Sequence, residues 1–148
     1  MEKSKKPEVV VGTYIISSKG KLLLVKSPKW GEQWMVPGGH IEYGERMMDA
    51  AKREVKEELG ISVRPLGVLL LGEGIFPRTF ARKKHFIYLE TLCIARDEKV
   101  KIDGEEVTEY RWFEPREAIR VAKDRAIKAT MREYMRQKRA GKFRFINI

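Results

Sequence analysis

Hydrophobic residues gather in short runs along the chain, and the first runs predict β-strands. Residues 9–17 (VVVGTYIIS) are rich in β-branched side chains and lead through a Ser-Lys-Gly turn to a second apolar run, residues 21–26. Two such runs joined by a short turn predict a hairpin. Further strands are predicted over residues 61–71, 85–95 and 107–113. Pro65 and Gly67 lie inside the first of these and favour an edge or bulged strand.

Three segments have the spacing of helices. The first, residues 45–59, precedes Gly60, a residue type that often ends a helix. The second begins after Pro115 and is short. The third begins near Asp124, a good N-cap residue, and runs to about residue 138. Its apolar side chains form one stripe, made of Ile127, Met131, Tyr134 and Met135.

The order of these elements predicts a mixed α/β domain with a mostly antiparallel or mixed sheet, because hairpin-length loops join several strands. A chain of 148 residues fits a single domain that needs no metal or disulfide staple. Its one cysteine, Cys93, cannot form an internal disulfide. Residues 1–8 are expected to be a flexible N-terminus, and residues 140–148 a tail or a terminal strand. Trp112 and Phe113 are expected in the core.

Charge and hydropathy limit the compartment and the partners. No apolar run approaches the ~20 residues of a transmembrane helix, and no signal-peptide pattern is visible, so a cytoplasmic protein is expected. The net charge of +10 favours an anionic partner, although it also serves solubility alone. Between residues 120 and 148 there are ten Lys and Arg but two Asp and Glu. Any RNA contact is therefore expected through this basic C-terminal helix and tail.

Three glutamates of the first predicted helix form a stripe beside its apolar face. Glu54, Glu57 and Glu58 are spaced i, i+3, i+4 and lie next to a seam made of Met48, Ala51, Val55 and Leu59. Like charges at this spacing repel by roughly 0.2–0.5 kcal/mol per pair, in the helix half whose dipole disfavours them. A hard divalent cation such as Mg²⁺ would relieve both effects. The alternative is a solvated helix with Glu–Lys pairs.

The wider spacing around these glutamates is similar to the Nudix box. All nine specified positions of that box are present, namely Gly39, Glu45, Arg53, Glu54, Val55, Glu57, Glu58, Gly60 and Ile61. A chance match in a chain of this length is on the order of one in a million. The predicted order of elements between residues 9 and 138 also resembles the whole Nudix domain.

The resemblance implies an α/β/α sandwich with a mixed sheet and an enzyme that hydrolyses nucleoside diphosphates linked to another moiety, using Mg²⁺ or Mn²⁺. By resemblance, Glu54 and Glu58 would bind the metal. Glu57 would be a third ligand or hold a metal-bound water, and Gly38 would offer its backbone carbonyl. Such ions would neutralise the pyrophosphate and lower the pKa of a bound water, which fits clustered carboxylates.

The remaining catalytic assignments also come from the resemblance. Arg53 would pair with Glu45 and orient the neighbouring glutamate, which is a supporting role. A general base is still required, and family members place it in the box or on a later loop. Glu106 is the favoured candidate here, with Glu105 and Glu109 as alternatives. The plain alternative is that these three are ordinary turn acids.

Substrate contacts are expected from loops. The candidates for phosphate contacts are the basic residues Arg78, Arg82, Lys83 and Lys84, and a solvated basic loop is the alternative. The candidates for stacking on a base are Trp30, Phe76 and Phe80, with core or rim packing as the alternative. His40 and His85 are weaker candidates for a general base or a pH switch.

ADP-ribose or a related nucleotide sugar leads as the expected substrate, with a (d)NTP or an oxidised nucleotide as the alternative. A non-catalytic Nudix module that binds RNA or a nucleotide is the alternative of another class. The complete glutamate set favours the enzyme, because a binding module would be free to lose these residues. Homodimers are common in the family, and the sequence leaves the oligomeric state open.

Overall fold

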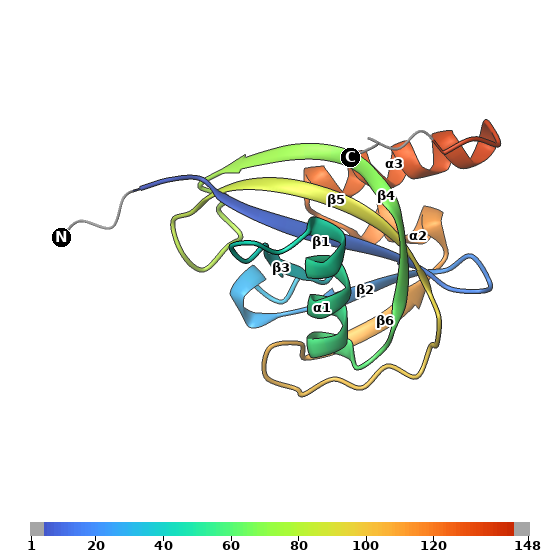
Figure 1. The fold of residues 1–148 in the computed structure, drawn as a ribbon, viewed down its shortest axis with the longest axis horizontal. Helices are drawn as coiled ribbons and strands as arrows, with labels where there is room; N and C mark the ends of the chain where they lie inside the picture. The colour runs from blue at the N-terminus through green and yellow to red at the C-terminus, as the bar shows by residue number, and fades with distance from the viewer. Residues whose placement is uncertain (1–4, 144–148) are drawn as a thin grey trace.

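A computed structural model describes residues 5–143, which form one mixed sheet between helices (Figure 1). The strands are β1 (Glu8–Ile16), β2 (Leu22–Lys26), β3 (Gly38–His40), β4 (Val63–Ile75), β5 (His85–Ala95) and β6 (Glu109–Phe113). The helices are the 3₁₀ turn η1 (Pro28–Trp30) and the α-helices α1 (Met47–Leu59), α2 (Pro115–Val121) and α3 (Arg125–Arg139).

The sheet has the strand order β4-β5-β1-β2-β6, with β3 paired to β1. β1 runs parallel to β5 and antiparallel to both β2 and β3, which confirms the predicted mixed sheet. One half of β1 pairs with β3, where Val10 faces His40 and Gly12 faces Gly38. The end of β1 pairs with β2 at Ile16. β3 therefore lies beside the first half of the central strand.

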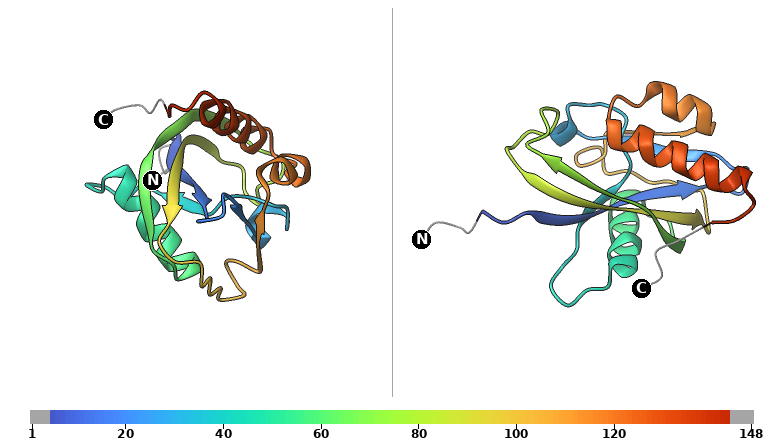
Figure 2. Two further views of the ribbon diagram at one scale, coloured as in Figure 1. Left: turned by 90° about the vertical axis from the view of Figure 1, so that its right-hand side faces the viewer. Right: turned by 90° about the horizontal axis from the view of Figure 1, so that it is seen from above.

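Helices cover both faces of the sheet, with α1 on one side and α2 and α3 on the other (Figure 2). Alternate residues of β1 and β2 point to opposite faces of the sheet and so pack against the two helix layers. Tyr14 and Leu22 pack with Met131 of α3, whereas Ile15 and Leu23 pack in a second cluster with α1. The predicted α/β/α sandwich is therefore confirmed.

Packing confirms several local predictions. The stripe of α3 faces the first cluster, and Pro115 begins α2 as expected. Phe113 is fully buried, while Trp112 is partly buried against the second cluster. β4 is an edge strand with irregular register at Pro65/Gly67, which matches the predicted bulge. Cys93 is buried and free.

The structure differs from the predicted elements at three places. β3 was not predicted, because it has three residues, two of them glycine, and no apolar alternation. β4 runs to Ile75, beyond the predicted end of this strand at residue 71, because pairing with β5 outweighs the poor strand propensity of Gly72 and Gly74. α1 begins at Met47 rather than at Glu45, because the Glu45 side chain accepts from the backbone N–H of Glu42 in the preceding turn.

The predictions for the chain ends fall mostly outside the described residues. Residues 1–4 and 144–148 are not described, and β1 already begins at Glu8. Residues 140–143, at the start of the predicted tail, form neither helix nor strand. Between residues 5 and 143, no helix has both the length and the apolar character to cross a membrane.

Candidate active site

The three glutamates of α1 differ strongly in burial. Glu58 is 8% exposed, the side chain of Glu54 is 15% exposed, and that of Glu57 is 59% exposed. The difference follows from the packing of α1, whose Ala51 and Val55 face the sheet. The predicted stripe therefore runs from the buried side of the helix out to its solvent edge, and two of the acids are withdrawn from water.

Arg53 ties the glutamates to the segment before α1. Its Nε and Nη2 atoms donate to the two carboxylate oxygens of Glu45, at 2.7 and 3.0 Å. Its Nη1 atom donates to Glu54 at 2.8 Å, and Nη2 also donates to the backbone carbonyl of His40 at 3.0 Å. This arginine hydrogen-bonding lowers the pKa of Glu45 to about 2. Arg53 is thus anchored by a two-pronged ion pair with Glu45, and it orients Glu54 through a single hydrogen bond from Nη1.

The two glycines of β3 leave the space that this arrangement needs. A Cβ atom on Gly39 would collide with the carboxylate of Glu54. A Cβ atom on Gly38 would collide with the backbone carbonyl of Val11 on β1. Gly39 therefore lets α1 lie close over β3, and Gly38 lets β3 lie close to β1.

The pKa of Glu58 lies far above the ordinary value of a glutamate. Burial raises its pKa to about 8, since the charged form is poorly solvated. The nearby positive charge of Lys29 and a hydrogen bond with the Gly38 backbone oppose that rise, while Glu54 and Glu106 add to it. A bound cation would favour the ionised form in the same way as Lys29, only more strongly.

The donor set fits a hard divalent cation. The carboxylates of Glu54 and Glu58 supply oxygen atoms of the kind that Mg²⁺ takes, and Mg²⁺ completes its shell with water and substrate phosphates. No group of three or more His, Cys, Asp or Glu side chains within residues 5–143 forms a ready-made metal cluster. The protein thus offers one buried and one partly buried carboxylate rather than a closed cage.

Of the acids on the later loop, Glu106 is the one whose charge acts on Glu58. The loop is held by Asp103, whose Oδ1 atom accepts from the backbone N–H groups of Glu105, Glu106 and Val107 at 3.0–3.3 Å. Glu109 instead lies on β6 and forms an ion pair with Lys26 at 3.2 Å. The charge interaction with Glu58 favours Glu106 as the loop acid near the helix, and the ion pair with Lys26 argues against Glu109.

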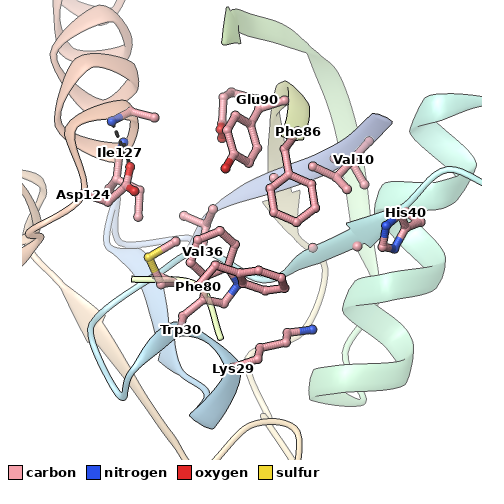
Figure 3. A pocket seen from close by; sticks show the side chains of 17 residues that line it. Val10, Lys29, Trp30, Val36, His40, Phe80, Phe86, Glu90, Asp124 and Ile127 are labelled. Atoms are coloured by element: carbon pink, nitrogen blue, oxygen red, sulfur yellow. Dashed lines mark hydrogen bonds between the residues drawn. The ribbon is translucent and has the colours of Figure 1, made fainter. Parts of the chain in front are cut away.

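A pocket lined by aromatic rings adjoins β3 on the side away from the acidic helix (Figure 3). Trp30 and Phe80 have ring centroids 4.6 Å apart, and Phe80 meets Phe86 edge-on at 5.1 Å. Gly38 and Gly39 line the same pocket, so β3 separates it from Glu54. The polar side chains of the lining are Lys29, His40, Tyr88, Glu90 and Asp124.

Comparison with known proteins decides the family. A model of the NUDIX domain matches residues 6–137. The chain belongs to the Nudix family. It is similar to nucleoside triphosphatase NudI of Escherichia coli K12, with 31% identity over 128 residues that cover 80% of this chain and 90% of that protein. The protein is therefore a hydrolase that acts on pyrophosphate linkages, in a family whose members generally use divalent metal ions.

Solved Nudix structures share the fold. A NUDIX hydrolase from Nitrosomonas europaea has a TM-score of 0.75 and 23% identity, covering 97% of this chain and 78% of that one. The MutT protein from Methanosarcina mazei Go1 has a TM-score of 0.71 and 22% identity, covering 96% and 100% of the two chains. At these identities, the likenesses show a shared α/β/α fold and nothing about activity.

The predicted substrate-binding residues of this Nudix domain fall in separate places. Trp30 lines the aromatic pocket, together with Phe80. Phe76 and Lys84 instead line a second hollow, with Lys5, Lys6, Glu8, Lys83 and His85. Arg78 and Arg82 are exposed and line neither of these two pockets. The basic residues expected to bind phosphate therefore lie partly in the second hollow and partly on the exposed surface.

The two histidines are each paired with a carboxylate. His40 lies 2.5 Å from Glu8, which also pairs with Lys84, and His85 lies 2.7 Å from Glu73. Glu8 thereby joins the start of β1 to the basic loop.

Sequence reasoning missed four polar or special positions of the Nudix pocket. Lys29 and Glu90 were not considered, Asp124 was considered only as a helix cap, and Gly12 only as part of a strand. Glu90 carried a signal, since it is the single charged residue within the otherwise apolar run of residues 86–95. A buried strand tolerates a carboxyl group only at a cost, which usually has a reason.

Proposed function

We propose that the protein is a Mg²⁺-dependent pyrophosphohydrolase of nucleoside triphosphates, with Mn²⁺ as an alternative ion. One observation carries the proposal: the two glycines of β3 are shared by the acidic helix and by the aromatic pocket. A planar base held by Trp30 and Phe80 would leave its phosphates near Gly38 and Gly39, beside Glu54 and Glu58.

Each residue of this arrangement has a distinct task. Glu54 and Glu58 would hold the cation, with the Gly38 carbonyl beside them and Glu57 reaching from the solvent edge. Arg53 keeps Glu54 in position through its bond of 2.8 Å. A bound divalent ion supplies charge neutralisation of the phosphates and a more acidic water. Glu106 would take the proton of the attacking water, since its loop faces Glu58.

The choice of substrate rests on the comparison. The name of the E. coli relative, a nucleoside triphosphatase, supports a triphosphate rather than ADP-ribose or a nucleotide sugar. The cluster of aromatic rings suits one planar base, which all of these substrates carry. ADP-ribose, the leading expectation from sequence, stays in the test panel beside the triphosphates.

A nucleotide panel tests the proposal directly. Wild type is incubated with four dNTPs, four NTPs and ADP-ribose in Mg²⁺, and phosphate release is measured with and without a coupling pyrophosphatase or phosphatase. We expect triphosphate turnover that EDTA abolishes and that Glu58→Gln lowers by at least about 100-fold. Glu117→Gln on α2 removes the same charge away from the site and should leave turnover unchanged. Turnover of ADP-ribose alone, or of no member, would contradict the proposal.

RNA contact is a separate part of the proposal. The solvent side of α3 carries exposed basic residues, namely Arg125, Arg132, Arg136, Lys138 and Arg139. Binding through them should weaken as salt rises, because each phosphate contact displaces counterions. Binding of a single-stranded RNA that does not depend on salt or on these residues would contradict it. A homodimer and a cytoplasmic location stay predictions.

A further inference from the structure

Glu90 is a buried carboxyl group that the proposed metal chemistry does not use. It lies on β5 directly opposite Gly12 of β1 in the parallel ladder, and it is 4% exposed. Its Oε2 atom has no hydrogen-bond partner among residues 5–143. A Cβ atom on Gly12 would lie 2.5 Å from that oxygen, so the glycine leaves the room in which the carboxyl group sits.

A second buried polar atom lies in the same neighbourhood. The hydroxyl of Tyr14, two residues after Gly12 and on the same face of β1, lies beside the Glu90 carboxyl group and Thr130. The charges of Glu90 and Asp124 act on it. Tyr14 can satisfy one acceptor site of Glu90, but a carboxylate has about four such sites, and the described residues leave the others open toward the pocket.

Glu90 lines the aromatic pocket on the side away from Lys29. In Figure 3 the rings of Trp30, Phe80 and Phe86 lie between Glu90 and Lys29. Asp124 lines the same pocket and uses only its Oδ1 atom to cap α3, at 2.8 and 3.1 Å from two backbone nitrogens. One side of the pocket therefore presents carboxyl oxygens, while its other side presents the cation that acts on Glu58.

The chemistry of these groups restricts the ring that can bind. An ionised carboxylate only accepts hydrogen bonds, and it can accept two at once. Guanine has two adjacent N–H donors, at N1 and N2, on one edge. Adenine and cytosine place an acceptor next to their amino group, and thymine and uracil flank their one N–H with carbonyl oxygens that repel a carboxylate. Guanine is therefore the base that matches such an edge.

We propose that Glu90 is a specificity-determining residue, whose carboxylate accepts the N1–H and N2–H groups of a guanine base stacked among Trp30, Phe80 and Phe86. This inference rests on the proposed function, since it places the base of the same substrate. Asp124 lines the same pocket and adds a second carboxyl group that can accept from the donor edge of the base. A site built to hydrogen-bond a substrate strongly rejects analogues that leave its buried groups unpaired.

The test compares kcat/KM for dGTP, dATP, dCTP and dTTP in wild type, Glu90→Gln and the control Glu117→Gln. We expect wild type to prefer dGTP. Glutamine has nearly the same shape but offers one acceptor and a competing donor, so Glu90→Gln should lower kcat/KM for dGTP roughly 10- to 100-fold. The other three substrates should change by less than about 3-fold. Glu90→Asp, which keeps the charge, should retain the order of preference.

Binding measured without hydrolysis separates the two proposals. Quenching of tryptophan fluorescence reports dGMP and dTMP binding, since Trp30 lines the pocket. Triphosphate turnover with no preference for dGTP, or a preference that Glu90→Gln leaves intact, overturns the role of Glu90 while the proposed function stands. If no triphosphate is hydrolysed, the proposed function fails and the binding measurement decides. If wild type binds dGMP more tightly than dTMP and Glu90→Gln removes this difference, the role of Glu90 is supported. If dGMP does not bind, or binds wild type and Glu90→Gln equally, the role of Glu90 is overturned.

Discussion

Gly39 on β3 lies so close to Glu54 on α1 that a Cβ atom on the glycine would overlap the Glu54 carboxylate. The glycine is therefore required by the position of the acid, and its backbone φ is not in the left-handed region. The same carboxylate accepts from Arg53 at 2.8 Å. Glu54 is thus held between an arginine on its own helix and bare backbone across from it.

Gly39→Ala should displace Glu54 and weaken metal-dependent turnover. The added methyl group cannot be accommodated unless the carboxylate moves, so we expect kcat to fall and the Mg²⁺ concentration for half-maximal activity to rise, each by roughly 10- to 100-fold. Gly72→Ala is the matched control, because a Cβ atom there meets its nearest neighbour at an ordinary 3.5 Å. A Gly39→Ala enzyme with a wild-type Mg²⁺ dependence would refute the constraint.

Arg53→Lys should cost activity although the charge is kept. A lysine has one ammonium group and cannot bond both oxygens of Glu45, Glu54 and the His40 carbonyl together. We expect kcat to fall roughly 10- to 100-fold with a smaller change in KM, measured on the best triphosphate. Lys52→Gln, which breaks an exposed pair with Asp49, should have wild-type kinetics. Equal losses in both variants would point to a general charge effect instead.

Features that depend on neighbouring residues within one helix or strand could be predicted from the sequence. Arg53 and the three glutamates of α1 follow from spacing along one helix, where periodicity alone sets which side chains are neighbours. β5 was predicted with its observed bounds because its apolar run is long and its flanks are polar. The roles of the glutamates as metal ligands stay predictions, since the contacts place these residues but do not test their chemistry.

Features that arise between elements could not be predicted in the same way. β3 exists because its backbone pairs with β1, and its own residues carry no strand signal. The pocket brings Lys29 of η1 together with Asp124, which lies 95 positions further along the chain. Burial of Glu58 likewise depends on how α1 packs, because spacing alone treats it as equivalent to the exposed Glu57. Such relations are set by tertiary contacts.

Without metal, the protein should lose stability as pH rises from about 4.5 to 7. Burial raises the pKa of Glu90 from 4.5 to about 7, so in this interval the folded state holds a proton that the unfolded state has released. Groups with lowered pKa values, such as Glu45 and Glu133, act in the opposite direction at lower pH. Urea unfolding in EDTA at pH 5 and pH 8 measures the change.

Glu90→Gln is the variant that assigns this pH dependence. It should show a smaller loss of unfolding free energy between pH 5 and pH 8 than wild type, because glutamine does not titrate. A remaining slope of the same sign is expected from Glu58, whose pKa is raised to about 8. The groups facing Glu90 are Tyr14 and Tyr88 from the sheet and Asp124 from the start of α3. An unchanged slope in Glu90→Gln would show that Glu90 stays ionised throughout.

Asp124→Ala should destabilise the fold by about 1 kcal/mol, the usual cost of removing a helix N-cap. Its Oδ1 atom accepts from the backbone N–H groups of Ala126 and Ile127, and the helix that it caps contributes Ile127 and Met131 to the larger core cluster. Asp124→Asn keeps the cap oxygen and should unfold close to wild type in urea. If Asp124→Asn lost as much as Asp124→Ala, the negative charge at the helix start would be the stabilising feature, and the cap hydrogen bonds would not be.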